Sequence, residues 1–401
     1  MTTTSEATFQ HLLASRAKLM RPGGGPGGGQ KPQYSLSGGY PDPGSFPFDE
    51  LVQATARMMQ EEGAEALNYG EAQGYLPLRE LICRKYQHFE GLEIGPENVL
   101  IANGSSHALS LAFSAFVDVG DAIICEAPTF SGTLNTIRRH GADVHTVPVD
   151  GDGIVTSAVR EQLAALRVEG RSCKLIYTLP NFHNPAGPTA TLQRRQELIA
   201  LAHEFETLIL EDDAYGELRF EGEPLPSLYA LDDRGVVIRS GTVSKILGAG
   251  MRIGWLVAPA PLVPYLQAFN FGGGVAPFTS RIATYYLRDH IIEHVAQLVE
   301  IYRRKRDAMI EGLNEVLEGT DAEISQPQGG FFVWIKLPTA ADPAKVAQLA
   351  REAGVAFVPG ANFFPHDGGE RHIRLAYSYE TEEKCFEGAK AIAWAIRGAM
   401  G

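Results

Sequence analysis

Short apolar runs alternate with helical patterns from about residue 75 to 260, and this alternation limits the possible folds more than any other feature. The runs are rich in β-branched residues, whereas stretches such as 106–118 and 192–205 place apolar residues on one helical face. Strands that alternate with helices predict an α/β fold with a mostly parallel sheet sandwiched by helices. The predicted strands are 99–102, 122–126, 174–178, 207–211, 236–240 and 253–258.

The pattern changes near residue 288, where a long helical stretch leads into short strands at 330–335, 355–358 and 373–376 and a terminal helix. We expect a large domain over 49–287 and a smaller α+β domain over 288–401. Residues 1–48 are expected to be an N-terminal arm and part of the small domain, which then comes from both chain ends. Residues 8–20 have helical spacing. The glycine-rich segment 21–30 is interpreted as a flexible connector or, alternatively, as a mobile lid near a site.

Charge and cysteine content narrow the functional classes. A net charge of −13 disfavours nucleic acid as a partner, because phosphate backbones bind basic surfaces. The four cysteines show no metal-ligand spacing, which indicates a reducing compartment and no metal site. No apolar run has the length of a membrane span, and the N-terminus lacks a signal pattern. We therefore expect a cytoplasmic protein without a membrane partner.

Ligands of open α/β sheets bind beyond the carboxyl ends of the strands, so the residues after each predicted strand are the candidates. Ser105 and Ser106 follow a glycine and open a helix, which favours an anion site or, alternatively, a plain helix cap. Phe130 follows the second strand and is expected either to stack on a flat ligand or to pack in the core. Asn184 lies in a turn, and its amide either reaches a ligand oxygen or serves the turn alone.

The next two strand ends carry charged residues. Asp212 follows a buried apolar strand, where a carboxylate needs a partner such as a bound cation or a protonated heterocycle; capping of the next turn is the alternative. Lys245 lies between the hydroxyls of Thr242 and Ser244 and the later Arg252, which together are donors suited to a phosphate. A partly desolvated lysine beside other cations has a lowered pKa and can attack carbonyl groups.

Taken together, these residues resemble the fold type I pyridoxal 5′-phosphate (PLP) aminotransferases of class I and II. The resemblance covers nearly the whole chain and is greatest to the subgroup of 2-aminoadipate and kynurenine aminotransferases. It rests on an ordered set of motifs: LNYGEAQGYLPLR, NGSSHAL, NFHNPAG, EDDAY, SGTVSKILGAGMRIGW, QGGFFVW, FVPGANFF and IRLAYS.

The resemblance implies a role for each residue at the cofactor. Lys245 would hold PLP as a Schiff base and carry the substrate's α-proton, and Asp212 would keep the pyridine nitrogen protonated. Tyr215 and Asn184 would hydrogen-bond the phenolic oxygen, and Phe130 would stack on the ring. The phosphate would be held by Ser105, Ser106, Thr242, Ser244 and Arg252.

The resemblance also implies the substrate contacts and the assembly. Arg374 would bind the substrate α-carboxylate through a bidentate pair, with Asn184, Gly39 and Tyr40 also in the substrate site. Tyr69 would reach the phosphate of the neighbouring subunit's cofactor, which implies a homodimer with shared active sites.

The implied reaction is transamination between an L-amino acid and a 2-oxo acid with ping-pong kinetics. Oxidases, lyases, racemases and carbon–carbon bond-forming enzymes use the same cofactor apparatus and are the alternative. A PLP-sensing transcription regulator is disfavoured, because only about 35 residues precede the SGGYPDP motif and the net charge is negative.

The identity of the substrate is left open, because the glycine-rich segments 23–29 and 270–278 depart from the family pattern. Tyr40, Phe271, Phe278 and the pair Phe363-Phe364 favour aromatic or apolar substrates, although each residue can also belong to the core.

Overall fold

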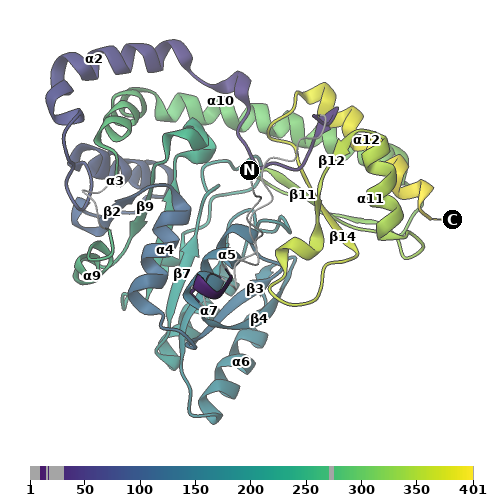
Figure 1. Ribbon diagram of the computed structural model, residues 1–401, viewed down its shortest axis with the longest axis horizontal. Helices are drawn as coiled ribbons and strands as arrows, with labels where there is room; N and C mark the ends of the chain where they lie inside the picture. The colour runs from purple at the N-terminus through teal and green to yellow at the C-terminus, as the bar shows by residue number, and fades with distance from the viewer. Residues whose placement is uncertain (1–9, 15–16, 18–30, 271–274, 401) are drawn as a thin grey trace.

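The computed structural model describes residues 10–14, 17, 31–270 and 275–400 and shows a large α/β part joined to a smaller one (Figure 1). The large part is built on an eight-stranded sheet with the order β2-β9-β8-β7-β6-β3-β4-β5. Its strands are β2 (Val99–Ala102), β3 (Ala122–Ala127), β4 (Asp143–Asp150), β5 (Gly153–Ile154), β6 (Cys173–Thr178), β7 (Leu208–Asp212), β8 (Val237–Thr242) and β9 (Gly254–Val257).

The central strands of this sheet run in one direction. The pairs β4–β3, β3–β6, β6–β7 and β7–β8 are parallel, whereas β9 is antiparallel to both of its neighbours, β8 and β2. Strand β2 therefore has the same direction as β8. As a result, the carboxyl ends of β2, β3, β6, β7 and β8 meet at one edge, and the mostly parallel sheet is confirmed.

Helices cover both faces of the sheet because successive strand residues point to opposite sides. Ile123 and Cys125 of β3 pack with residues of α4 and α5, whereas Ile124 between them packs with α6 and α7. The helices of the large part are α2 (Phe48–Ala66), α3 (Leu76–Glu90), α4 (Ser105–Phe116), α5 (Ser131–His140), α6 (Thr156–Val168), α7 (Leu192–Phe205), α8 (Leu228–Leu231) and α9 (Val263–Gln267).

A long helix, α10 (Pro277–Leu317), runs from the large part to the smaller one along the top of Figure 1. The small part has an antiparallel sheet of order β10-β11-β14-β13 and a separate parallel pair, β1–β12. Because β1 lies near the N-terminus and β12 lies near the C-terminus, both chain ends contribute to this α+β unit. Its elements are β1 (Tyr34–Ser35), β10 (Glu323–Ile324), β11 (Phe332–Lys336), α11 (Pro343–Glu352), β12 (Val355–Ala356), β13 (Val358–Pro359), β14 (His372–Ala376) and α12 (Glu382–Gly398).

Some predicted elements differ from the structure. The strand predicted at 355–358 is two short strands in two different sheets, β12 and β13, so a local apolar run did not reveal the change of partner. Strand β7 ends at Asp212 itself, one residue beyond the predicted end. Strand β4 was not predicted, because it is only half-buried and carries Asp, His and Thr among its valines.

Three further expectations concern the chain ends and the domain limits. Of the helix predicted over 8–20, the structure describes residues 10–14 and 17, with a 3-10 turn at Gln10–Leu12. The glycine-rich segment 21–30 lies outside the described residues. The predicted boundary at 287/288 falls inside α10, and the division into domains stays a prediction. Among helices of the described ranges, none combines the length and the apolarity needed to cross a membrane.

Candidate active site

Lys245 lies just beyond the carboxyl end of β8, in a π-helical turn at Ser244–Gly248. Its partly buried Nζ donates to the carbonyl oxygen of Gly39 at 3.0 Å and faces the rings of Tyr215 and Phe331, 5.5 and 5.8 Å from their centroids. Burial, followed by the charge of Arg374, lowers the pKa of Lys245 to about 8. The amine is therefore closer to its neutral, nucleophilic form than a surface lysine is.

Thr242 fixes the turn that carries Lys245. Its hydroxyl donates to the carbonyl oxygen of Ile253 (2.8 Å) and accepts from the backbone N–H of Ser244 (3.0 Å); the Ser244 hydroxyl lies 2.8 Å away. A hydroxyl has one hydrogen to donate, and here it goes to Ile253. Thr242 thus holds β8, β9 and the lysine turn together, and its assignment as a phosphate ligand stays a prediction, as does that of Ser244.

Asp212, the last residue of β7, is a buried carboxylate held by two hydroxyls. Its Oδ2 accepts from the Tyr177 hydroxyl at 2.6 Å and its Oδ1 from the Ser240 hydroxyl at 3.1 Å. Burial raises the pKa of Asp212 to about 6, against the lowering effect of these hydrogen bonds. No Lys or Arg of the described residues forms an ion pair with it, so a protonated ring nitrogen would supply the missing cation.

The next residue, Asp213, has a different environment. It forms an ion pair with Arg239, which also binds Glu90 through two contacts of 2.6 and 2.7 Å. Burial alone would raise the pKa of Asp213, but the charge of Arg239 lowers it overall. Asp213 lies one residue beyond the end of β7. Of the two acids, Asp212 is the one that accepts from the Tyr177 and Ser240 hydroxyls and feels the charge of Lys245.

A glycine-lined corner joins the start of α4 to Arg252. Gly104 precedes Ser105 with φ 81°, and a Cβ at Gly104 would lie 2.9 Å from the Arg252 guanidinium. Arg252 Nη2 donates to the Asn103 carbonyl oxygen at 2.9 Å. The first N–H groups of an α-helix have no partner within the helix, so this corner combines free backbone donors with a cation. The geometry fits a phosphate, with Ser105 half-buried and Ser106 exposed at the same helix start.

Arg374 of β14 is a buried guanidinium without a carboxylate partner among the described residues. It lies between the rings of Phe332 and Phe363, 4.1 and 4.8 Å from their centroids. Its Nη1 donates to Asn184 Oδ1 at 3.0 Å and its Nη2 to the Ser37 carbonyl oxygen at 2.7 Å. Burial lowers its pKa to about 10, so an incoming carboxylate would offset an unfavourable burial of charge.

The remaining predicted residues are divided between the site and the surface. Tyr215 is buried beside Phe331, with ring centroids 5.2 Å apart, and burial raises its pKa. Phe130 is half-buried at the start of α5. Tyr40 is 61% exposed and contacts Tyr379 edge-to-face.

Tyr69 stands apart from these contacts. It follows α2 and is 89% exposed, and its backbone N–H is bonded to the side chain of the preceding Asn68. Within one chain, direct hydrogen bonds join Lys245 to Gly39 and Arg374 to Asn184, and neither bond involves Tyr69.

Sequence reasoning missed four groups of the site. Tyr177 and Ser240 were treated only as strand residues, although a hydroxyl in a buried strand needs a hydrogen-bond partner and this was a usable signal. Phe332 belongs to a quoted motif but was given no role. His107, whose Nδ1 accepts from the Asn103 N–H at 3.1 Å, lies one residue beyond the predicted phosphate ligands.

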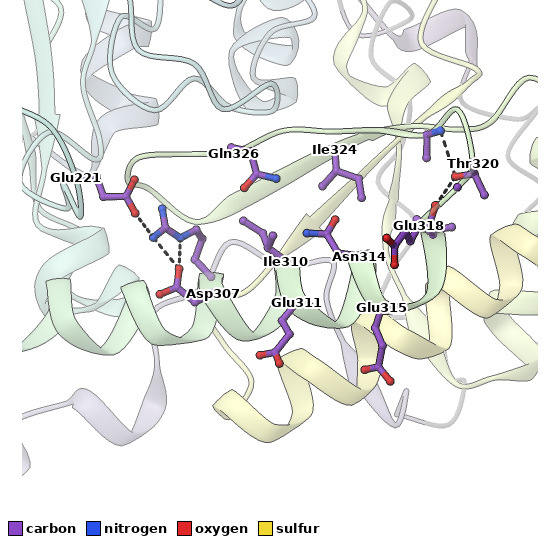
Figure 2. A pocket seen from close by; sticks show the side chains of 14 residues that line it. Glu221, Asp307, Ile310, Glu311, Asn314, Glu315, Glu318, Thr320, Ile324 and Gln326 are labelled. Carbon is purple, nitrogen blue, oxygen red and sulfur yellow. Dashed lines mark hydrogen bonds and ion pairs between the residues drawn. The ribbon is translucent and has the colours of Figure 1, made fainter.

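A groove of about 1010 Å³ lies elsewhere on the molecule (Figure 2). It runs between α10 and the segment that contains β10, and Figure 2 shows acidic side chains along it, including Asp307, Glu311 and Glu315. It contains none of the predicted site residues. One group with metal-ligand spacing, His203, Asp232 and Asp233, occurs in the described part of the chain. Asp232 already accepts three backbone N–H bonds there, which indicates a role in holding the loop.

Four features of the site together indicate a cofactor and its substrate. Among the described residues, the buried Asp212 has no cationic partner and the buried Arg374 has no carboxylate partner. The Gly104 corner offers donors for an anion, and the pKa of the Lys245 amine is lowered. A protonated pyridine ring with a phosphate and an aldehyde would match Asp212, the Gly104 corner and Lys245, and the carboxylate of an amino acid would match Arg374. The fold and the site thus define an enzyme of the pyridoxal phosphate class.

The family that matches this chain is aminotransferase class I and II, over residues 36–392. The chain is 35% identical to aromatic-amino-acid aminotransferase 1 of Thermococcus litoralis (91% of this chain, 88% of that protein). It is 34% identical to the 2-aminoadipate transaminase of Thermus thermophilus (91% and 90%). The crystal structure of Pyrococcus horikoshii kynurenine aminotransferase in complex with PMP has a TM-score of 0.89 at 32% identity, covering 100% of this chain and 98% of that one.

The chain therefore belongs to the aminotransferase class I and II family. It is a PLP-dependent aminotransferase, which exchanges an amino group between an amino acid and a 2-oxo acid. The predicted family, subgroup and cofactor are confirmed, and the comparisons favour transamination over the oxidase and lyase alternatives.

Proposed function

We propose that this enzyme takes its amino group from an aromatic or apolar L-amino acid and delivers it to a 2-oxo acid in a ping-pong reaction. The observation that carries this proposal is the buried guanidinium of Arg374, which has no carboxylate partner among the described residues and lies between two phenyl rings. Its free donors suit an α-carboxylate. The rings beside it suit an apolar side chain better than a charged one.

Lys245 is proposed as the residue that binds the cofactor and moves the substrate's α-proton. When bound, pyridoxal phosphate supplies an aldehyde that condenses with amines and a ring that withdraws electrons from the substrate Cα. A general base works best when its pKa lies near the working pH, and the pKa of Lys245 is lowered to about 8. The Gly39 carbonyl oxygen, 3.0 Å from Nζ, orients the amine between proton transfers.

The other residues are proposed to hold the cofactor and to orient it relative to the substrate. Asp212 would hold a proton on the ring nitrogen, since its carboxylate is buried and forms no ion pair with a Lys or Arg that the structure describes. Asn184 accepts from Arg374 through Oδ1, which leaves its NH₂ group free to donate to the phenolic oxygen. The remaining proposed contacts to the ring and the phosphate are Tyr215, Phe130, Ser105, Ser106, Thr242, Ser244 and Arg252.

The substrate preference draws support from both the structure and the relatives. Phe332 and Phe363 are buried against Arg374, and Tyr40 extends an exposed ring beside Tyr379. Two of the similar proteins are named for aromatic amino acids and for kynurenine. Phe278 lies at the start of α10, and Phe271 lies outside the described residues.

The test is an amino-donor screen on the purified enzyme with PLP. Each donor is mixed with the enzyme in the absence of an oxo acid, and the loss of the cofactor's visible absorbance is followed. Aromatic donors should react at least tenfold faster than 2-aminoadipate, and the released product should be the 2-oxo acid. The preference is wrong if dicarboxylic donors react fastest. Release of ammonia without conversion of the cofactor to its amine form would contradict transamination.

We further propose a homodimer with shared active sites. Tyr69, Phe48 and Val52 are exposed on or next to α2, and a second copy would cover this apolar face. Mixing Tyr69→Phe with Lys245→Ala tests the sharing: if each site uses a tyrosine from the other subunit, mixed dimers regain one intact site and part of the activity. The absence of any regain would show that the sites are independent.

The proposed location is the cytoplasm, because the four cysteines of the chain are all unpaired. Labelling of free thiols in the protein isolated from separated cell fractions tests this location.

A further inference from the structure

Tyr177 is a fully buried tyrosine in β6, next to the strand that ends in Asp212. Its hydroxyl donates to Asp212 Oδ2 at 2.6 Å, which is the shorter of the two hydrogen bonds that this carboxylate receives from hydroxyl groups. The other side of the same hydroxyl accepts from the Thr133 hydroxyl at 2.8 Å. Thr133 is also fully buried, so no water competes for either bond.

The direction of these two bonds follows from the number of hydrogens. Thr133 gives its one hydrogen to Tyr177, so the Tyr177 oxygen is used as an acceptor there and its own hydrogen is directed at Asp212. Burial, followed by the charge of Asp212, raises the pKa of Tyr177 well above its usual value, so the hydroxyl stays protonated. The pair therefore stabilises a carboxylate that accepts, and it disfavours a carboxyl group that must donate.

Thr133 also lies in the first turn of α5, and its N–H donates to the carbonyl oxygen of Phe130 at 3.1 Å. The residue proposed to stack on the cofactor ring and the residue proposed to bind the ring nitrogen are thus joined by two hydroxyls. This connection crosses from α5 to the end of β7 through the interior of the large part.

We propose that Tyr177, oriented by Thr133, is a positioning residue that keeps Asp212 ionised and directed at the nitrogen of the cofactor ring. The inference rests on the role proposed for Asp212. It adds to that role the statement that Asp212 depends on a specific hydroxyl relay for its charge.

The charged and titratable groups around Asp212 determine in which direction its pKa changes when the Tyr177 hydroxyl is removed. Burial and the neighbouring Asp213 raise the pKa of Asp212, whereas Tyr177, Ser240 and the charge of Lys245 lower it. Removing the Tyr177 hydroxyl takes away the largest of the lowering contributions. A hydrogen bond to a charged group is worth enough to shift the pKa of Asp212 upward by roughly one to two units. The carboxylate would then be protonated across much of the neutral range.

The experiment compares the holoenzymes of wild type, Tyr177→Phe, Thr133→Val and the control Tyr86→Phe. Tyr86 is an equally buried tyrosine, but its hydroxyl accepts from the Trp255 indole at 2.8 Å instead of donating to Asp212. For each protein, the rate of the amino-acid half-reaction and the dissociation constant of PLP are measured from pH 5 to 9. Both are repeated with N-methylated PLP, whose ring nitrogen is permanently charged.

In Tyr177→Phe, the acidic limb of the pH profile should move to higher pH by roughly one to two pH units, both for the rate of the half-reaction and for the dissociation constant of PLP. The limb should move less in Thr133→Val and should stay in place in Tyr86→Phe. With the N-methylated cofactor, the rate relative to normal PLP should rise ~10-fold or more in Tyr177→Phe compared with wild type. Thermal unfolding should shift similarly in Tyr177→Phe and Tyr86→Phe, so loss of stability cannot imitate the result.

Unmoved pH limbs in Tyr177→Phe, or an equal response to the N-methylated cofactor in all four proteins, would overturn the relay while leaving transamination by Lys245 intact. A wild-type protein that fails to bind PLP would instead contradict the proposed site as a whole. The two failures are therefore distinguishable.

Discussion

Replacing Arg374 with lysine is expected to lower kcat/KM for amino acids ~30- to ~150-fold. The guanidinium is buried between Phe332 and Phe363, and burial lowers its pKa to about 10. This lowering of the Arg374 pKa corresponds to about 3 kcal/mol of unfavourable free energy for burying the charge, which a substrate carboxylate can offset. Lysine keeps the charge but loses the planar fork and the second donor, so about 2 to 3 kcal/mol of binding should disappear.

The loss should fall mainly on KM, because the α-carboxylate keeps its charge throughout the reaction and is bound equally in the ground and transition states. The assay is stopped-flow absorbance of the cofactor against amino-acid concentration. Arg371→Lys is the matched control, since Arg371 lies on the same segment but bonds to the carbonyl oxygen of Pro338. An amine that lacks the carboxylate should react at the same low rate in both wild type and Arg374→Lys. A loss below threefold, or an equal loss for that amine, would refute the reasoning.

Three other perturbations have defined outcomes. Lys245→Ala should abolish the covalent attachment of PLP, and mass spectrometry after borohydride reduction should then show no adduct. In wild type, the rate of attachment should rise with pH through about 8, because the amine loses its proton there. Gly39→Ala should destabilise the protein by about 1 to 3 kcal/mol and slow the half-reaction, because the new Cβ would lie 2.7 Å from the Phe332 ring; denaturant unfolding and kinetics measure both. Lys85→Met should cost about 3 to 5 kcal/mol in urea unfolding, because Glu217 would remain buried without its ion pair; a loss below 1 kcal/mol would contradict a buried pair.

The sequence predicted the parts of the fold that follow from local pattern. The alternation of strands and helices predicted the parallel sheet. Because strand ends in such a sheet meet at one edge, the residues after each strand were candidates for the site, and Asp212 and Lys245 are among them. The antiparallel direction of β9 was not predictable from its apolar run, since strand direction is set by the connection and the partners rather than by composition.

The contacts between residues far apart in the chain could not be predicted from local pattern. Tyr177 and Asp212 are separated by 35 positions, and Thr133 by 44 from Tyr177, so their hydroxyl relay exists only after β6, β7 and α5 are packed. Arg374 was predicted as a carboxylate ligand from the family resemblance, but its position between Phe332 and Phe363 depends on the small antiparallel sheet. The hydrogen bond from the Thr242 hydroxyl to the Ile253 carbonyl oxygen also joins two strands and could not be predicted from local pattern, whereas the role of Thr242 at the phosphate stays a prediction.

At the end of β7, two aspartates follow each other in the sequence but contact different partners. Asp212 contacts the Tyr177 hydroxyl and Asp213 contacts Arg239, so one peptide unit separates the acid proposed to bind the cofactor from an acid that forms a buried ion pair. Shortening or lengthening β7 by a single residue would exchange the two environments, with a chemically correct residue in each wrong place. The length of β7 therefore decides which of the two acids meets the hydroxyls of Tyr177 and Ser240 and which meets Arg239.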